Sequence, residues 1–110
     1  MSDYQTIVAG SENGAWDKLY EAMRLCAEGS SVNNYAQVMA NVRRAQEAAF
    51  ELGMYVTDTR WSAVAMALEK IRTLLSSTPY AEFGFYRQAL TNNFNGMLEK
   101  MKRLRLKGKL

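Results

Sequence analysis

The sequence predicts an all-α fold: a small four-helix bundle with a long C-terminal helix and a basic tail. Apolar residues recur at intervals of three and four along most of the chain. Val, Ile and Thr form no alternating, strand-like run in the body, and only one Pro and seven Gly interrupt the sequence. A chain of 110 residues has the size of one domain. We therefore predict a single helical domain over residues 1–110.

The first helix is predicted over residues 15–28. Residues 1–14 form an N-terminal arm with at most a short helical turn, because Gly10 and Gly14 are expected to end it. Gly29 is expected to stop the helix, and the loop "GSSVNN" follows. The inward stripe of this helix is Trp16, Leu19, Tyr20, Met23, Cys26 and Ala27.

The second helix is predicted over residues 34–52, with Asn33 or Asn34 as its N-cap and Gly53 just past its end. Its apolar residues cover a broader arc than a simple surface helix needs, so we expect it to be central and packed on two sides. The third helix is predicted over residues 59–76, with Thr57 or Asp58 as its cap. Its inner face is Trp61, Val64, Ala65, Leu68, Ile71 and Leu75.

The fourth helix raises a question at "TNNFNG", residues 91–96, because Asn and Gly are poor helix formers. One apolar stripe nevertheless continues in phase through this segment: Phe83, Tyr86, Leu90, Phe94, Met97, Met101 and Leu104. We therefore predict one helix from Pro79 to about Leu104, with Thr78 as N-cap and any kink near Asn93. At ~1.5 Å per residue it would span roughly 40 Å. A helix of that length should overhang its bundle or find a partner along its end, so we expect self-association.

The charge of the chain is concentrated at its C-terminal end. Residues 1–98 carry 8 Lys/Arg and 10 Asp/Glu, whereas the last twelve residues carry six basic side chains and one acidic side chain. The basic residues are Lys100, Lys102, Arg103, Arg105, Lys107 and Lys109. From Arg103 onward they alternate with Leu and Gly at period 2, a strand pattern for which this chain offers no partner strand. Residues 103–110 are therefore predicted to be a flexible tail.

Three roles for this tail remain open. Basic residues at a helix C-terminus complement the helix dipole and keep a small protein soluble. They can also contact the phosphates of a nucleic acid or an acidic protein surface, or lie on an anionic membrane surface. The apolar stripe is short for a membrane-binding helix, so nucleic acid or an acidic partner is preferred.

The side chains needed for catalysis are sparse. There is no His, which removes the commonest general base and metal ligand. Cys26 lies on an apolar helix face and is predicted to be a buried, inert thiol. The carboxylates are scattered over helix faces, and "VAGSENG" lacks the spacing of a phosphate-binding loop. We predict no enzyme activity, no metal and no cofactor.

Two segments suggest interaction surfaces. "PYAEFGFYR" places Phe85 outward near Tyr80 and Arg87, and aromatic residues and Arg are enriched at interfaces. We expect these three, together with Met97, Met101 and Leu104, to form an interface.

Residues 48–71 allow an alternative, a degenerate helix-turn-helix DNA-binding protein. Its turn would be about five residues too long, and its outward face is thin for reading bases: Arg60, Ser62, Ala63, Met66 and Lys70.

The chain has no long apolar run and no apolar signal segment, and its lone cysteine allows no internal disulfide. We therefore expect a cytoplasmic protein. The preferred function is that of a non-catalytic accessory subunit or modulator of a larger protein or nucleoprotein assembly, with the general look of a small protein from bacteria, phages or mobile elements. It is expected to form a homo-oligomer or to join a larger complex.

Overall fold

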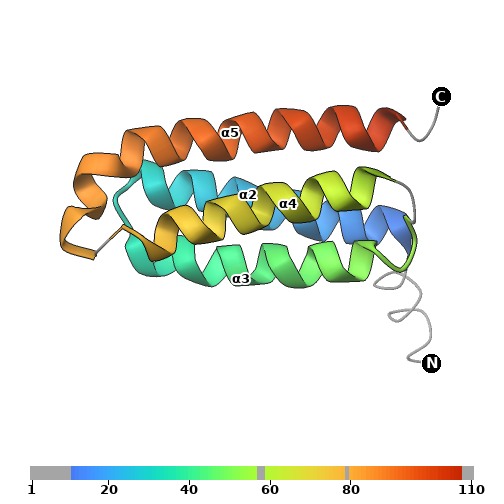
Figure 1. Cartoon of the computed structure of the whole chain (residues 1–110), viewed down its shortest axis with the longest axis horizontal. Helices are drawn as coiled ribbons and strands as arrows, with labels where there is room; N and C mark the ends of the chain where they lie inside the picture. Colours follow the sequence, from blue (N-terminus) through green and yellow to red (C-terminus); the bar gives the residue numbers. More distant parts are fainter. Residues whose placement is uncertain (1–10, 57–58, 79, 108–110) are drawn as a thin grey trace.

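The computed structural model describes residues 11–56, 59–78 and 80–107, which form four long α-helices and one short 3-10 turn (Figure 1). The helices are α2 (Glu12–Ser31), α3 (Tyr35–Leu52), α4 (Thr59–Ser76) and α5 (Phe83–Lys107), and the 3-10 turn η1 (Tyr80–Glu82) precedes α5. Within the described ranges there is no strand. The predicted all-α fold with a long C-terminal helix is confirmed.

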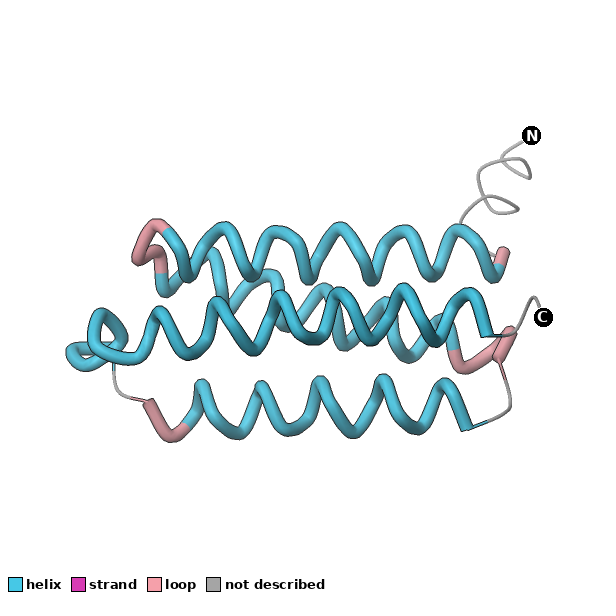
Figure 2. Tube along the Cα trace, turned by 90° about the horizontal axis from the view of Figure 1, so that it is seen from above, coloured by secondary structure: helices cyan, strands magenta, loops and turns pink. Residues whose placement is uncertain are grey.

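The four helices form an up-down-up-down bundle, in which successive helices run in opposite directions (Figures 1 and 2). α2 packs against α3 and α5, and α4 packs against the same two helices, so the helices close a ring. Of these four neighbouring pairs, the backbones of α2 and α3 approach each other most extensively, and those of α4 and α5 approach each other least. No helix in the described part of the chain combines the length and apolar character that crossing a membrane requires.

α2 is longer at both ends than the prediction of 15–28, because two glycines do not end helices as expected. Ser11 is the N-cap, and its Oγ accepts a hydrogen bond of 2.9 Å from the backbone N–H of Gly14. Gly29 lies within the helix, where a Cβ would come within 3.0 Å of Val38 Cγ2. Its missing side chain therefore lets α2 and α3 approach closely. Asn33, with φ of 61°, makes the turn instead.

α3 matches its predicted range closely. Asn34 is its N-cap and accepts a hydrogen bond of 3.0 Å from the backbone N–H of Gln37. After its end, Gly53 has φ of −60°, so its role is not a left-handed turn. A Cβ there would lie 2.5 Å from Trp61 Nε1, which donates a 2.6 Å hydrogen bond to the carbonyl of Ala49. The indole of α4 therefore needs a glycine at this position.

α5 runs without a break through residues 91–96, which confirms the prediction from the in-phase apolar stripe. It ends at Lys107, three residues beyond the predicted end, so residues 103–107 are helical and do not follow the strand pattern. Its start also differs, because η1 forms the first turn and Thr78 Oγ1 donates back to the Leu74 carbonyl instead of capping α5. Pro79 and residues 108–110 lie outside the described residues.

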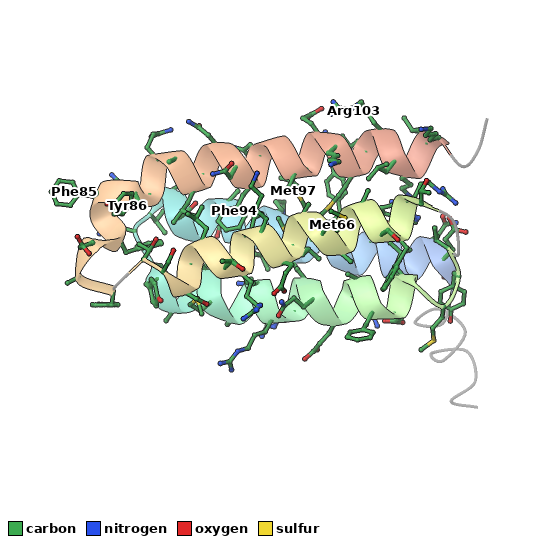
Figure 3. The ribbon with its side chains drawn as sticks, in the orientation of Figure 1. Met66, Phe85, Tyr86, Phe94, Met97 and Arg103 are labelled. Carbon is green, nitrogen blue, oxygen red and sulfur yellow. The ribbon has the colours of Figure 1, made fainter. Side chains whose placement is uncertain are left out.

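The core is one cluster that draws on all four helices. Its largest fully buried side chains include Trp16, Leu19, Met23, Leu52, Leu68, Phe83, Leu90 and Phe94. The residues of the predicted α5 stripe are buried or partly buried, except Tyr86, half of whose surface is exposed. The tyrosine is near the end of the bundle, where fewer neighbouring helices cover α5 (Figure 3).

Candidate binding surface

The basic side chains near the end of α5 divide between two sides of the helix. Lys102 and Arg105 line a cavity shared with α2, and Lys100 lines a cavity shared with α4. Arg103 and Lys107 are exposed, and Lys109 lies outside the described residues. The structure therefore does not gather the predicted basic site into one patch.

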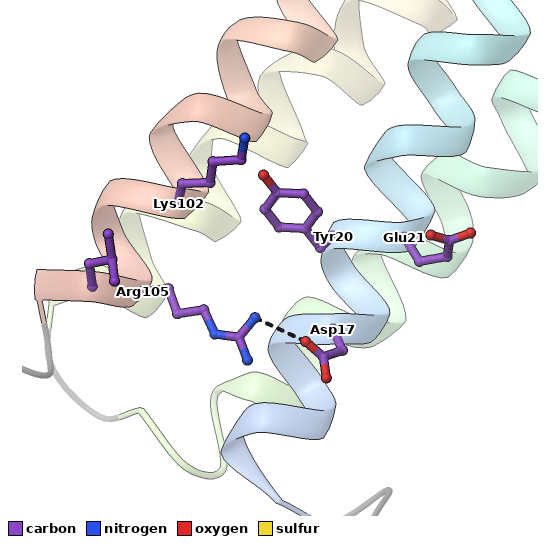
Figure 4. Close-up of a pocket in the computed structure, with 6 residues that line it drawn as sticks. Asp17, Tyr20, Glu21, Lys102 and Arg105 are labelled. Carbon is purple, nitrogen blue, oxygen red and sulfur yellow. Dashed lines mark hydrogen bonds and ion pairs between the residues drawn. The ribbon is translucent and has the colours of Figure 1, made fainter.

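On the α2 side, the cations are held by groups of the protein itself (Figure 4). The cavity there has a volume of about 520 Å³. Arg105 is 2.9 Å from the carboxylate of Asp17, and it also donates to Asn13 at 3.3 Å. Lys102 Nζ lies 5.8 Å from the centre of the Tyr20 ring and 3.4 Å from a Glu99 oxygen. Both predicted binding residues on this side therefore serve intramolecular contacts.

On the α4 side, a groove runs between α4 and α5, with a cavity of about 480 Å³. Its lining residues are Ala63, Met66, Ala67, Lys70, Ile71, Asn93, Met97 and Lys100. Among the described residues, the charged side chains of this lining are two lysines, one from each helix, and none is a carboxylate. Met66 is 72% exposed on α4 (Figure 3). We call this feature the α4–α5 groove.

Three cations continue along α5 beside this groove. Lys100, Arg103 and Lys107 are spaced by three and four residues, so they share one side of the helix. All three are exposed, and within the described residues none makes an ion pair. We call them the basic stripe. Figure 3 shows Arg103 projecting outward from α5.

The formal charge also differs between the α2–α3 half and the α4–α5 half of the bundle. Residues 12–52, which span α2 and α3, carry 4 Lys/Arg and 6 Asp/Glu, a formal charge of −2. Residues 59–107, which span α4 and α5, carry 9 Lys/Arg and 3 Asp/Glu, a formal charge of +6. Residues 99–107 contribute +4 of this charge and residues 59–98 contribute +2, so most of the positive charge lies at the end of α5.

The predicted aromatic surface lies at the opposite end of α5 from the basic stripe. Phe85 is 88% exposed at the tip of the bundle (Figure 3), and Tyr80 is also exposed. Tyr80 meets the ring of Tyr35 edge to face, with 5.4 Å between ring centres. Arg87 Nη1 donates to the carbonyl of Ser31, so its guanidinium holds α5 to the α2–α3 turn. The aromatic rings, not Arg87, are available at this tip.

The other predicted interface residues belong to the core. Met101 is 1% exposed, Met97 is also buried, and Leu104 is partly buried against the core. The bundle covers Met101 and part of Leu104, which removes the surface on which they were expected to bind a partner, whereas Met97 lines the α4–α5 groove. Self-association stays a prediction.

The helix-turn-helix alternative also meets a geometric obstacle. α3 and α4 lie side by side and antiparallel (Figures 1 and 2), whereas a helix-turn-helix crosses its helices at about 90–120°. The residues of its expected outward face serve other contacts. Arg60 donates to the Leu104 carbonyl at 3.4 Å, and Ala63, Met66 and Lys70 line the α4–α5 groove. The antiparallel packing of α3 and α4 lacks the crossing angle of a helix-turn-helix, and DNA binding by this segment stays a prediction.

Cys26 is the remaining group with reactive chemistry. It is buried between α2 and α3, its thiol 3.8 Å from the Val38 carbonyl, and burial raises its pKa to about 12. Within residues 11–56, 59–78 and 80–107, no three His, Cys, Asp or Glu side chains gather in an arrangement that could hold a metal ion. The surface offers charge and apolar contact for binding.

The chain matches no known protein family, and neither a curated protein nor a solved structure shows significant similarity to it.

Proposed function

We propose that this protein is a non-catalytic accessory subunit or modulator of a larger protein or nucleoprotein assembly, and that it binds an anionic surface of that assembly through the basic stripe. The observation that carries the proposal is the row of Lys100, Arg103 and Lys107, three exposed cations that make no ion pair with any residue of the described ranges. Elsewhere the cations of this bundle are largely engaged, as in the pair of Lys18 and Glu51 at 3.0 Å. A row of unpaired charge attracts a partner of opposite sign and speeds its association.

Direct binding to three defined anions tests this function. Fluorescence anisotropy is measured with a 20-base-pair DNA duplex, a single-stranded RNA and polyglutamate, each over a range of salt concentrations. We expect at least one of them to bind at low salt. For duplex DNA, the logarithm of the binding constant should fall with the logarithm of salt at about −0.9 per phosphate contacted.

The matched control removes the same number of charges from the other half of the bundle. Replacing Lys100, Arg103 and Lys107 by Gln should weaken binding and flatten the salt dependence. Replacing Lys18, Arg43 and Arg44 by Gln should leave both nearly unchanged, because these residues lie on α2 and α3. If none of the three probes binds, or if both variants lose affinity equally, the proposed function is wrong.

A further inference from the structure

The α4–α5 groove has the features of a surface that receives a helix. Its floor is apolar, and Ala63 and Ala67 are small enough to let a third helix come close to α4. Met66 is flexible and polarizable, and it lies largely exposed where it can adapt to the side chains of a partner. α4 has 18 residues, so the groove extends along it for at most ~27 Å, about five helical turns. A helix of ordinary length fits within that span.

The charges at the groove define the partner further. Lys70 on α4 and Lys100 on α5 both line it, and the lining has no carboxylate to neutralise them. A lysine stem covers apolar surface while its ammonium group reaches the solvent edge, so both lysines can contact the polar flank of a docked helix. The basic stripe continues the positive charge beyond the groove.

An apolar floor with cationic edges matches an acidic amphipathic helix better than a nucleic acid backbone. The apolar face of such a helix would cover Met66 and Ala67, and its carboxylates would meet Lys70 and Lys100. A phosphate backbone could use the lysines, but it would gain nothing from the apolar floor between them. The backbones of α4 and α5 approach each other little, and the groove lies between the two helices.

We propose that the α4–α5 groove binds an acidic amphipathic helix of a partner protein. This inference rests on the proposed function and narrows its anionic surface to a helical protein segment. Recognition then has two separable parts, an apolar part that depends on Met66 and an electrostatic part that depends on Lys70 and Lys100.

The test uses a designed peptide as the probe. It is an 18-residue, end-capped peptide with Leu at positions i, i+3, i+4 and i+7 and Glu at most other positions. A second peptide has the same composition in an order that forms no apolar face, and a third carries Lys in place of Glu. Anisotropy measurements with the full chain should give binding to the first peptide at least about tenfold tighter than to the second, with no binding to the third.

Two pairs of variants locate the binding site. Lys100→Glu should weaken binding of the first peptide by about tenfold, whereas Lys102→Glu, the same change on the α2 side of α5, should weaken it by less than about threefold. Met66→Ser should also weaken it, and Leu106→Ser, an exposed apolar residue of the other cavity, should not. Circular dichroism melts confirm that each variant is folded.

The possible failures separate this inference from the function on which it rests. If polyglutamate or DNA binds but the first peptide binds no better than its scrambled form, the groove is not a helix site and the proposed function survives. If DNA binds more tightly than the peptide and loses its affinity with Lys100→Glu, the occupant is a nucleic acid and the inference is wrong. If no anionic probe binds at all, both fail together.

Discussion

The α2–α3 hairpin and the α4–α5 hairpin of this bundle have similar lengths but different packing and charge. α2 and α3 approach closely through small residues, as at Gly29, where a Cβ would come within 3.0 Å of Val38. Several of their surface charges are paired across and along the helices, as in Lys18 with Glu51 and Arg24 with Glu21. α4 and α5 pack more loosely, carry a formal charge of +6 and leave Met66 exposed.

From this difference we infer that the two hairpins have different roles, one in stability and the other in binding. Because α2 and α3 pack closely and several of their charges pair with each other, we assign this hairpin a structural role and call it the scaffold. A loosely packed hairpin with unpaired cations retains binding capacity at some cost in its own stability.

The largest expected contrast is in thiol reactivity. Since burial raises the pKa of Cys26 to about 12 from an ordinary value of 9.0, its thiolate fraction below pH 9 is lower by about a thousandfold. We expect Cys26 to react very slowly with a thiol reagent in the folded protein. A cysteine placed in the groove by Ala67→Cys, in a Cys26→Ala background, should react rapidly. Equal rates for the two thiols would show that α2 and α3 open as readily as α4.

The same pKa shift makes a prediction for stability against pH. The thiol of the unfolded chain ionises near 9.0, and the folded one ionises near 12. The contribution of Cys26 to stability is therefore constant below pH 9 and is lost as the pH rises from 9 toward 12. Chemical denaturation of the parent and of Cys26→Ala should show a steeper loss in the parent over this window. Parallel curves would contradict the raised pKa.

Core truncation should cost several kcal/mol in either hairpin, and more in the tighter one. Leu19 on α2 and Leu68 on α4 are both buried, so the same group is removed in each case. Leu→Ala changes in cores cost about 2–5 kcal/mol, and the cost rises where the surroundings cannot relax. We expect Leu19→Ala near the upper end and Leu68→Ala near the lower end, measured by urea unfolding. If Leu68→Ala lowers the unfolding free energy more than Leu19→Ala does, α4 is not the less tightly packed helix.

Two Gly→Ala changes should act in opposite directions. Gly53→Ala places a Cβ against the Trp61 indole and disturbs its hydrogen bond to Ala49, so we expect a loss of about 1–3 kcal/mol. Gly96→Ala meets no atom within 4 Å in the middle of α5, so we expect a gain of about 0.5–1 kcal/mol from helix propensity. Thermal melts of the two variants measure both effects.

The last turn of α5 should contribute least. Arg105 pairs with Asp17, whose side chain is largely exposed, and exposed ion pairs are worth about 0–1 kcal/mol. Deleting residues 105–110 should therefore shift the unfolding free energy by less than about 1 kcal/mol, although residues 105–107 are helical. If the truncated chain fails to fold, the end of α5 is an essential part of the bundle.

Much of the fold could be predicted from periodicity. The stripe from Phe83 to Met101 stays in phase through Asn92 and Asn93, and this outweighed their poor helix propensity because burial stabilises a helix more than propensity does. The helix ends were less predictable. Gly14 and Gly29 look like terminators in the sequence, but the Ser11 cap and the contact with Val38 decide their roles.

The candidate site was predictable only in part. The charge density at the end of α5 is visible in the sequence, and so is the i,i+3 spacing of Glu99 and Lys102. The groups of α2 that hold these side chains, Asp17 for Arg105 and the Tyr20 ring for Lys102, are distant in the sequence, so local spacing could not assign Arg105 and Lys102 to a different side from Lys100. Lys70 and Met66 could be placed on one outward helix face. Only the packing of α4 against α5 shows that this face borders a groove.

The most direct test of the division between scaffold and binding side is an NMR titration of the full chain with the acidic amphipathic peptide. We expect the backbone amide shifts to change at the groove, around Ala63, Lys70, Asn93 and Lys100. We expect them to stay nearly constant along the outer side of α2 and α3, around Glu21 and Glu47. Shift changes concentrated on α2 and α3, or spread evenly over the bundle, would contradict this division.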